Sequence, residues 1–333
     1  MSAKVVFIHL GSTVPKYLKK NICRTRRLFP NLEILVAGQS SVLEAIAQKV
    51  EAKYVPVSNI FGSSDLAPAG LARDGLDMKF WNGYWQKTFD RLLVIAEVHE
   101  KTTDGALVHI ESDVIITKDF PFDSLANSSK LMWGAFDDAA DIASIVFSPS
   151  MKESRWLANA LRDVAEIDNT ATDMTALATI RKQNPDKIRL LAATPELAIS
   201  TNQPGVVFDG LHIGEWVFGW DPKAHWGFRR RRIKINSHSE SVADGNLEVR
   251  GHSLFFTSNG HVATVSNLHV HSKELRFFDA DISKSLAALL KVTAQPRAWY
   301  GFVPSGFISW LASRLKRWST TLIKSARRKI VRA

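Results

Sequence analysis

Residues 106–114 read Ala106-Leu107-Val108-His109-Ile110-Glu111-Ser112-Asp113-Val114, an apolar run that ends in two carboxylates one residue apart. Its composition predicts a buried strand that extends to Ile116. Because side chains alternate along a strand, we expect Glu111 and Asp113 to point the same way. Two convergent carboxylates form a hard-oxygen site suited to Mg²⁺ or Mn²⁺. The same string also occurs at ordinary strand ends, where the acids are solvated or cap a turn.

Short apolar runs alternate with helix-like stretches on the N-terminal side of this strand. Two strands are predicted at Val5 to Leu10 and Leu32 to Ala37, and three helices at Lys16 to Leu28, Val42 to Val50 and Trp81 to Glu97. This order is typical of a mostly parallel sheet that helices cover on both faces. Ligands bind such sheets at the carboxyl ends of the strands, so functional residues are expected there.

The second half of the chain is predicted to contain one more helical region and the last strands of the sheet. The helical region runs from Trp156 to Ile180. A short strand at Gly205 to Phe208 precedes a loop rich in Gly and Trp, from Asp209 to Gly227. Strands at Ser253 to Thr257 and Val262 to His271 are expected to close the sheet in antiparallel fashion.

The overall composition is that of a folded, soluble protein, with 45% hydrophobic and 23% charged residues. Cys23 is the single cysteine, which excludes a disulfide framework and a cysteine-based metal site and favours a reducing, cytosolic setting. The apolar run at residues 5–10 is too short for a signal-peptide core. No stretch reaches the roughly 18 apolar residues that a membrane span requires.

The positive charge is concentrated at the C-terminus. Residues 307–333 hold eight Lys and Arg residues and no acid, and so supply eight of the ten formal net charges. Apolar side chains recur there at helical spacing, at Phe307, Leu311, Leu315, Trp318, Leu322 and Ala326. This pattern predicts an amphipathic basic helix, which either lies on an anionic membrane or packs on the body or a partner chain. We expect a catalytic domain over residues 1–280 and a basic tail over 281–333 that anchors the cytoplasmic protein to the inner face of the plasma membrane.

Several segments resemble one family. The strand that ends in Glu-Ser-Asp resembles the Asp-x-Asp motif of GT-A glycosyltransferases, with Glu111 in place of the first Asp. Three other segments resemble bacterial polysaccharide glycosyltransferases of this type, and the likeness covers about Lys4 to Phe278. They are the opening Phe7-Ile8-His9-Leu10-Gly11-Ser12 with Pro15, Lys16, Tyr17 and Asn21, then Phe80-Trp81 with Thr88 and Arg91, and finally Asn267-Leu268-His269-Val270-His271-Ser272-Lys273.

This resemblance implies a GT-A (Rossmann-like) mixed α/β sheet flanked by helices, a nucleotide-sugar donor, and dependence on Mn²⁺ or Mg²⁺. A UDP-sugar donor and a surface polysaccharide or lipid-linked saccharide acceptor are implied in the same way. The departure at position 111 leaves open whether Glu111 binds the metal or contacts the ribose. Ser112 lies between the two acids and is assigned to the same donor site.

The residues themselves suggest further members of the site. His269 and His271 alternate on one strand and share a face, so either imidazole is a possible metal ligand beside Asp113; two such histidines also occur as a polar surface. Lys273 is expected to reach the donor phosphates. The residues that follow the first strand, His9, Gly11 and Ser12, are expected to line the nucleotide pocket, and Arg91 either pairs with an acid or contacts phosphate.

Two carboxylates are candidates for the general base that an inverting transferase needs. Asp209 is the first and Asp173 the second, although each also fits the role of a turn or helix-cap residue. Trp216, Trp220 and Trp226 either stack on sugar rings or pack beneath their loop.

The function predicted from the sequence is sugar transfer from a nucleotide-sugar to a polysaccharide or glycolipid. A metal-dependent nucleotidyltransferase or sugar-nucleotide hydrolase is a close alternative. A non-catalytic membrane-surface protein is another. A nucleic-acid-binding protein would use Arg229 to Arg232 with the basic tail, but the nearly neutral body argues against nucleic acid as a partner.

Overall fold

The computed structural model describes most of the first 279 residues and little beyond them. The described residues are 3–11, 13–57, 76, 83–102, 105–201, 203, 205–218, 228–230, 245–271, 273–279, 299–302 and 311. Ser12, Trp220, Trp226 and nearly all of the predicted basic tail lie outside them, and so does the side chain of Trp216. The division of the chain at residue 280 therefore stays a prediction.

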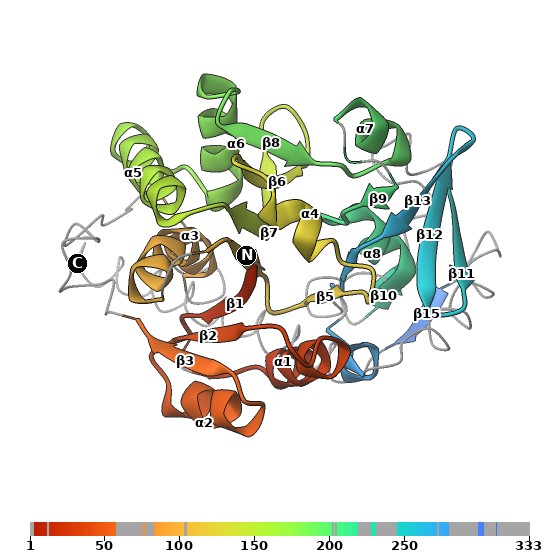
Figure 1. Ribbon diagram of the computed structural model, residues 1–333, viewed down its shortest axis with the longest axis horizontal. Helices are drawn as coiled ribbons and strands as arrows, with labels where there is room; N and C mark the ends of the chain where they lie inside the picture. The colour runs from red at the N-terminus through yellow and green to blue at the C-terminus, as the bar shows by residue number, and fades with distance from the viewer. Residues whose placement is uncertain are drawn as a thin grey trace, which may run out of the picture.

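A seven-stranded mixed sheet forms the centre of the molecule, in the order β3-β2-β1-β4-β7-β6-β8 (Figure 1). Six strands run parallel to one another, and β7 is antiparallel to both of its neighbours. The predicted mixed α/β sheet is thus confirmed. Its strands are β1 (Lys4–His9), β2 (Ile34–Gly38), β3 (Lys53–Pro56), β4 (Leu107–Ile110), β6 (Leu131–Ala135), β7 (Asp141–Ser148) and β8 (Ile188–Leu191).

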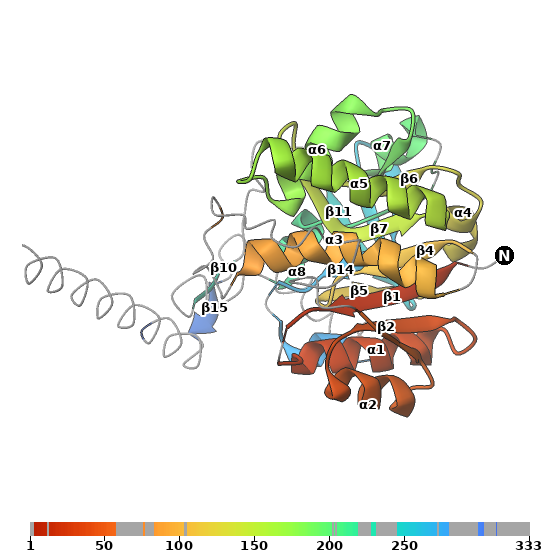
Figure 2. The same cartoon turned by 90° about the vertical axis from the view of Figure 1, so that its left-hand side faces the viewer.

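Helices cover both faces of this sheet, as Figure 2 shows from the side. Strand β1 is apolar at consecutive positions because Val6 and Ile8 face one core while Val5 and Phe7 face the other. The first core includes side chains of α3 (Tyr84–Lys101), α5 (Met151–Ile167) and α6 (Asp173–Gln183). The second includes side chains of α1 (Lys16–Leu28), α2 (Ser41–Lys49) and α4 (Phe122–Ala126). None of the described helices has the length and apolarity needed to cross a bilayer.

The C-terminal strands form a second sheet and do not close the first one, which corrects the sequence-based expectation. This sheet has the order β11-β12-β13-β9 and lies to the right in Figure 1. Its strands are β9 (Val206–Val207), β11 (Asn246–Arg250), β12 (Ser253–Ser258) and β13 (His261–Val265). It shares a third apolar core with α8 (His212–Phe218). The remaining elements are α7 (Pro195–Ser200), η3 (Leu275–Phe278) and the pair β10 (Phe228–Arg230) and β15 (Trp299–Phe302).

The helical region expected from Trp156 to Ile180 is two helices, because polar side chains end one and begin the next. Asp168 accepts hydrogen bonds from the backbone and hydroxyl groups of Thr170, which turns the chain after α5. Thr172 then caps α6 through a capping box with Thr175. The four earliest predicted elements, at β1, α1, β2 and α2, agree with the structure within two residues, whereas β3, β6, β7 and β8 were not predicted from the sequence.

One buried carboxylate ties α6 to the sheet. Asp141, at the start of β7, is fully buried and accepts a hydrogen bond from the indole of Trp133 at 2.7 Å. Arg181 of α6 binds the same carboxylate through Nε and Nη2, at 2.9 Å each. A buried carboxylate without its cation is costly, so this arrangement requires α6 to stay docked on β7.

We expect Arg181→Met to lower the free energy of unfolding by about 3 kcal/mol, because it leaves the Asp141 carboxylate buried beside Trp133 alone. The matched control is Lys182→Met, which removes the exposed cation next along the same helix and should change stability by less than about 0.5 kcal/mol. Urea denaturation of both variants measures the difference. Equal stabilities for the two would show that the Asp141 pair does not hold α6.

Candidate functional site

The Glu-Ser-Asp segment is a turn between two strands and not the end of one continuous strand. Strand β4 ends at Ile110, the backbone N–H of Val114 donates to the carbonyl of Glu111 at 3.1 Å, and β5 (Val114–Ile116) then begins in another sheet. The strand expected over residues 107–116 is therefore broken. The turn, and not strand alternation, brings Glu111 and Asp113 together.

Asn21, a buried residue of α1, holds this turn in place. Its amide donates hydrogen bonds to the carbonyls of Ser112 at 3.2 Å and Val114 at 2.7 Å. These bonds tie both ends of the turn segment to α1 and so limit the directions in which the two acids project.

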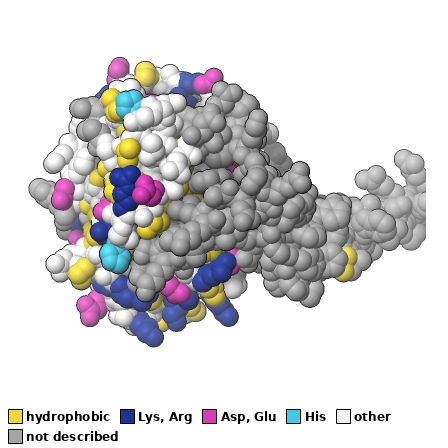
Figure 3. Space-filling model, turned by 90° about the vertical axis from the view of Figure 1, so that its right-hand side faces the viewer, with side chains coloured by type: hydrophobic (Ala, Val, Ile, Leu, Met, Phe, Trp, Pro, Cys, Tyr) yellow, Lys and Arg dark blue, Asp and Glu magenta, His cyan; other side chains and the backbone are white. Residues whose placement is uncertain are grey.

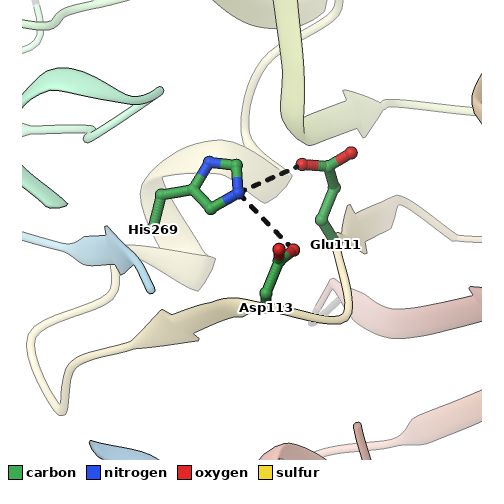
Figure 4. Close-up of side chains that lie close together, drawn as sticks. All are labelled: Glu111, Asp113 and His269. Atoms are coloured by element: carbon green, nitrogen blue, oxygen red, sulfur yellow. Dashed lines mark ion pairs between the residues drawn. The ribbon is translucent and has the colours of Figure 1, made fainter. Parts of the chain in front are cut away.

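Strand β14 (Asn267–His269) brings the third member of the site. It pairs antiparallel with β5, so that His269 lies opposite Val114, and the backbone N–H of Val270 donates to the carbonyl of Asp113 at 2.8 Å. His269 Nε2 lies 3.5 Å from Asp113 Oδ1 and 3.7 Å from Glu111 Oε2 (Figure 4). The strand expected over residues 262–271 is broken at Ser266, where the chain passes from the second sheet to β5.

The orientation of His269 depends on the residues behind it. Its Nδ1 lies 2.8 Å from the carbonyl of Gly210, so that this nitrogen donates and Nε2 faces the two acids. Asp209 accepts the backbone N–H of His269 at 2.8 Å and that of Gly214 at 2.7 Å. A Cβ on Gly214 would lie 2.0 Å from the carbonyl oxygen of His269, so only glycine lets α8 approach β14 this closely.

These residues form the wall of a pocket of about 300 Å³ at the carboxyl ends of β1 and β4. The pocket brings together nearly all the site residues that the sequence predicted. Those that line it are His9, Gly11, Arg91, Glu111, Ser112, Asp113, His269, His271 and Lys273. Tyr17 and Thr88, which belong to the segments that resemble glycosyltransferases, line it as well.

The acidic side chains in the pocket form ion pairs with basic ones. Arg91 of α3 forms a close ion pair with Glu111, and Lys273 Nζ lies 3.7 Å from Asp113 Oδ2. Burial alone would raise the pKa of Asp113, but His269 and Lys273 outweigh burial and hold that pKa well below its usual range. Burial alone would lower the pKa of His269, but Asp113 and Glu111 raise it to about 9. His269 is therefore a cation at neutral pH, held between two anions.

His271 differs from His269 in contacts and charge. Its ring stacks on that of His269, with 4.0 Å between the ring centroids, but it is not one of the three residues whose ligand atoms lie close together. Burial and the positive charge of His269 lower the pKa of His271 well below the ordinary value, so it is neutral at pH 7. Beyond it, Lys273 has φ 52°, a left-handed conformation that is uncommon outside glycine.

The two candidate general bases, Asp209 and Asp173, lie behind the wall of the pocket and do not line it. Both are buried, and burial raises the pKa of each to about 6. Asp209 accepts three backbone N–H groups, from Ile213, Gly214 and His269. Asp173 accepts the hydroxyl of Thr88 at 3.0 Å. This geometry fits positioning of the pocket wall, and the role of general base stays a prediction for both.

Tyr84 and Lys87 line the pocket but were not predicted from the sequence. Both lie in the first turn of α3, which contributes Thr88 and Arg91 one turn further along. The i, i+3 and i+4 spacing of Tyr84, Lys87, Thr88 and Arg91 was the signal that would have found them, since residues so spaced share one helix face.

The donor set fits a divalent cation. Glu111, Asp113 and His269 each offer one ligand atom, and these atoms lie within 4.8 Å of one another. The two carboxylates offer the oxygen ligands that Mg²⁺ and Mn²⁺ prefer, and the imidazole nitrogen is a ligand for first-row transition metals. Arg91 and Lys273 lie beside the two carboxylates and offset their negative charge, which favours the ionised state that a cation requires.

Comparison with known proteins gives only distant structural similarity. Neither a family model nor a curated protein matches the sequence. Among solved structures, the glycosyltransferase GlyE of Streptococcus pneumoniae TIGR4 is similar at 14% identity and a TM-score of 0.40, with 57% of this chain and 45% of GlyE covered. The galactosyltransferase LgtC, in complex with donor and acceptor sugar analogues, is similar at 12% identity and a TM-score of 0.40, with 57% of this chain and 73% of LgtC covered. An active-site mutant of LgtC is similar at 10% identity and a TM-score of 0.44, with 86% of this chain and 95% of the mutant covered. The chain thus spans less than half of GlyE, and at these scores the similarity assigns it no activity.

We expect metal binding to release about one proton near pH 7, because His269 must lose its proton before Nε2 binds a cation. Its pKa of about 9 means that the apparent affinity for Mn²⁺ falls by up to tenfold for each pH unit below 9. Titration calorimetry in buffers of different ionisation enthalpy measures the released proton. His269→Asn should abolish the release and His271→Asn should preserve it. Mn²⁺ binding by the unaltered protein without proton release would show that the cation does not displace the proton of His269.

Proposed function

We propose that the protein is a metal-dependent glycosyltransferase of the GT-A type, which moves a sugar from a nucleotide-sugar to a saccharide or lipid-linked saccharide. One observation carries the proposal: Glu111, Asp113 and His269, from distant parts of the sequence, converge in a pocket that also contains Arg91, Lys87 and Lys273. An anionic pair beside cationic side chains suits a cation bound together with a diphosphate.

Glu111, Asp113 and His269 would hold Mn²⁺ or Mg²⁺. The bound cation would act as a Lewis acid that neutralises the charge of the departing nucleoside diphosphate. Arg91 fixes Glu111 in position through its ion pair, which favours a metal-side role for Glu111 over contact with a ribose. Lys273 and Lys87 also line the pocket and would supply positive charge to the phosphate groups. His9, Gly11 and Tyr17 line the pocket by the end of β1 and the start of α1, where the nucleoside would lie.

A UDP-sugar is the donor that we propose, with a surface polysaccharide or glycolipid as acceptor, on the basis of the resembling segments. We also propose that the basic tail holds the protein at the inner face of the plasma membrane, where lipid-linked acceptors are made. The amphipathic pattern of residues 307–326 and the eight cations of residues 307–333 support this location.

Metal-dependent nucleotidyl transfer or sugar-nucleotide hydrolysis would use the same acids. Product analysis separates the three reactions, since a hydrolase releases the free sugar and a nucleotidyltransferase moves the nucleotide. A scaffold or a nucleic-acid-binding protein would bind no nucleotide-sugar, and binding to nucleic acid would survive loss of Asp113.

We expect Asp113→Asn to reduce the metal-dependent affinity for the donor nucleotide by about 100-fold and to abolish sugar transfer, because it removes a charged ligand without changing the shape of the site. Calorimetry with a panel of nucleoside diphosphates and nucleotide-sugars, in Mn²⁺ and in chelator, measures the affinity. The control is Asp123→Asn on the exposed first turn of α4. Full turnover by Asp113→Asn at saturating Mn²⁺ would remove the proposal.

Asp209→Asn is expected to lower the free energy of unfolding by about 2 kcal/mol and to weaken Mn²⁺ binding. An amide cannot accept all three backbone N–H groups that the carboxylate accepts, so the turn that holds His269 loosens. Thermal unfolding and calorimetry measure the two effects. A variant that keeps its stability and metal affinity but loses turnover would instead identify Asp209 as the general base.

A further inference from the structure

Helix α1 is the most strongly basic of the described helices. Its sequence Lys-Tyr-Leu-Lys-Lys-Asn-Ile-Cys-Arg-Thr-Arg-Arg-Leu holds six cationic residues and no acid. The two buried or half-buried arginines bind backbone carbonyls: Arg24 donates to those of Ile116 and Asp279, and Arg26 to those of Val50, Pro30, Leu32 and Glu51. The other four, Lys16, Lys19, Lys20 and Arg27, lie on the outer side of the helix.

Within the described residues, one of these four cations forms an ion pair and three do not. Lys20 pairs with Asp279 at 2.8 Å. Within the part of the chain that the structure describes, no carboxylate forms an ion pair with Lys16, Lys19 or Arg27, and all three are exposed. Together with Lys20 they recur at the three-, four- and seven-residue intervals that place side chains on one helix face. We call this set of four residues the α1 basic face.

The charge placement opposes the stability of the helix. Lys16 and Lys19 lie in the first turn, next to the positive end of the helix dipole, and the helix has neither an acid in that turn nor a side-chain cap. Cations at that end cost a few tenths of a kcal/mol each. Residues that destabilise their own helix in this way are typical of a functional surface.

These cations do not belong to the pocket at the ends of β1 and β4. The pocket is lined by Tyr17, whereas Lys16, Lys19, Lys20 and Arg27 are not among its residues. Figure 3 shows Lys and Arg side chains along the lower border of the molecule, and Figure 1 draws α1 in this lower part. The adjoining η3 adds Leu275, an apolar side chain that is 36% exposed and whose carbonyl accepts a hydrogen bond from Lys20.

We propose that the α1 basic face is a second membrane-docking surface, which binds the headgroups of anionic lipids directly. The surface belongs to the folded domain and is separate from the basic tail. A bilayer suits this face better than an anionic polymer for two reasons. The outward face of a helix is convex, and the exposed Leu275 beside the cations can insert into a lipid interface. The proposal does not rest on the proposed catalytic activity.

Docking through this face orients the protein. The helix whose outer side would contact the headgroups carries Tyr17 in the wall of the pocket, so docking would hold this wall one helix diameter, roughly 10 Å, from the headgroups. A reaction on a lipid-linked substrate gains from this orientation as well as from proximity.

The first test is co-sedimentation of the full chain with phosphatidylcholine vesicles that contain or lack phosphatidylglycerol. The variant Lys16→Gln/Lys19→Gln/Arg27→Gln should bind the anionic vesicles about 100-fold more weakly, since each cation near the surface contributes roughly tenfold or less. The matched control, Lys130→Gln/Lys152→Gln/Lys182→Gln, removes the same charge elsewhere and should lose less than about threefold. The midpoint of urea denaturation, measured in both variants, shows that the fold is intact. Equal losses in the two variants would overturn the proposal.

The second test uses Cys23, the single cysteine, which is half-buried among the residues of the α1 basic face. An environment-sensitive dye on Cys23 should shift its emission to the blue on anionic vesicles, and high salt should reverse the shift. The same dye on Lys182→Cys in a Cys23→Ser background should not respond. Vesicle binding without a shift at Cys23 would show that the tail alone attaches the protein. Retained vesicle binding by the α1 variant, with loss of binding to a soluble anionic polysaccharide, would assign the face to that polymer and overturn the proposal.

Discussion

The antiparallel pairing of β14 with β5 is the interaction on which the site depends. It places His269 opposite Val114 and lets the backbone of Val270 bind the carbonyl of Asp113, so that three side chains from two distant segments offer their ligand atoms to one point in space. The pairing in turn needs Gly214, because any Cβ there would collide with the His269 carbonyl. Backbone pairing therefore sets the position of the His269 imidazole, and the turn held by Asn21 sets those of the two carboxylates.

Charge compensation makes this concentration of ionisable groups compatible with a folded protein. Glu111 faces Arg91, Asp113 faces Lys273, and His269 lies between the two acids as a cation. Burying such groups costs free energy that their mutual attraction only partly returns. A divalent cation can replace the proton of His269 without leaving either acid unpaired. The two carboxylates are thus held in fixed orientations by the fold itself.

The sequence predicted which residues lie near one another better than how the chain brings them together. Nine of the residues predicted for the site, from strand ends, from spacing and from a family resemblance, line one pocket. The reason given for the convergence of Glu111 and Asp113 was wrong, since a turn held by Asn21 does what strand alternation was expected to do. Strand β7 escaped prediction because burial on both faces removes the alternation that marks a strand. Strand β14 was merged with β13 because periodicity does not show a change of sheet. Such changes are decided by tertiary pairing, which a single sequence does not encode locally.

The separation in sequence between the two halves of the site also sets the order of events during folding. Strand β5 belongs to the first half of the chain and β14 lies far beyond it, so the pairing between them closes a long loop and gains nothing until the domain around it has formed. During synthesis, the ribosome has released nearly all of the α/β domain before His269 emerges. The ligand triad is consequently assembled last, and a nascent or truncated chain that lacks β14 retains the two acids but not the site.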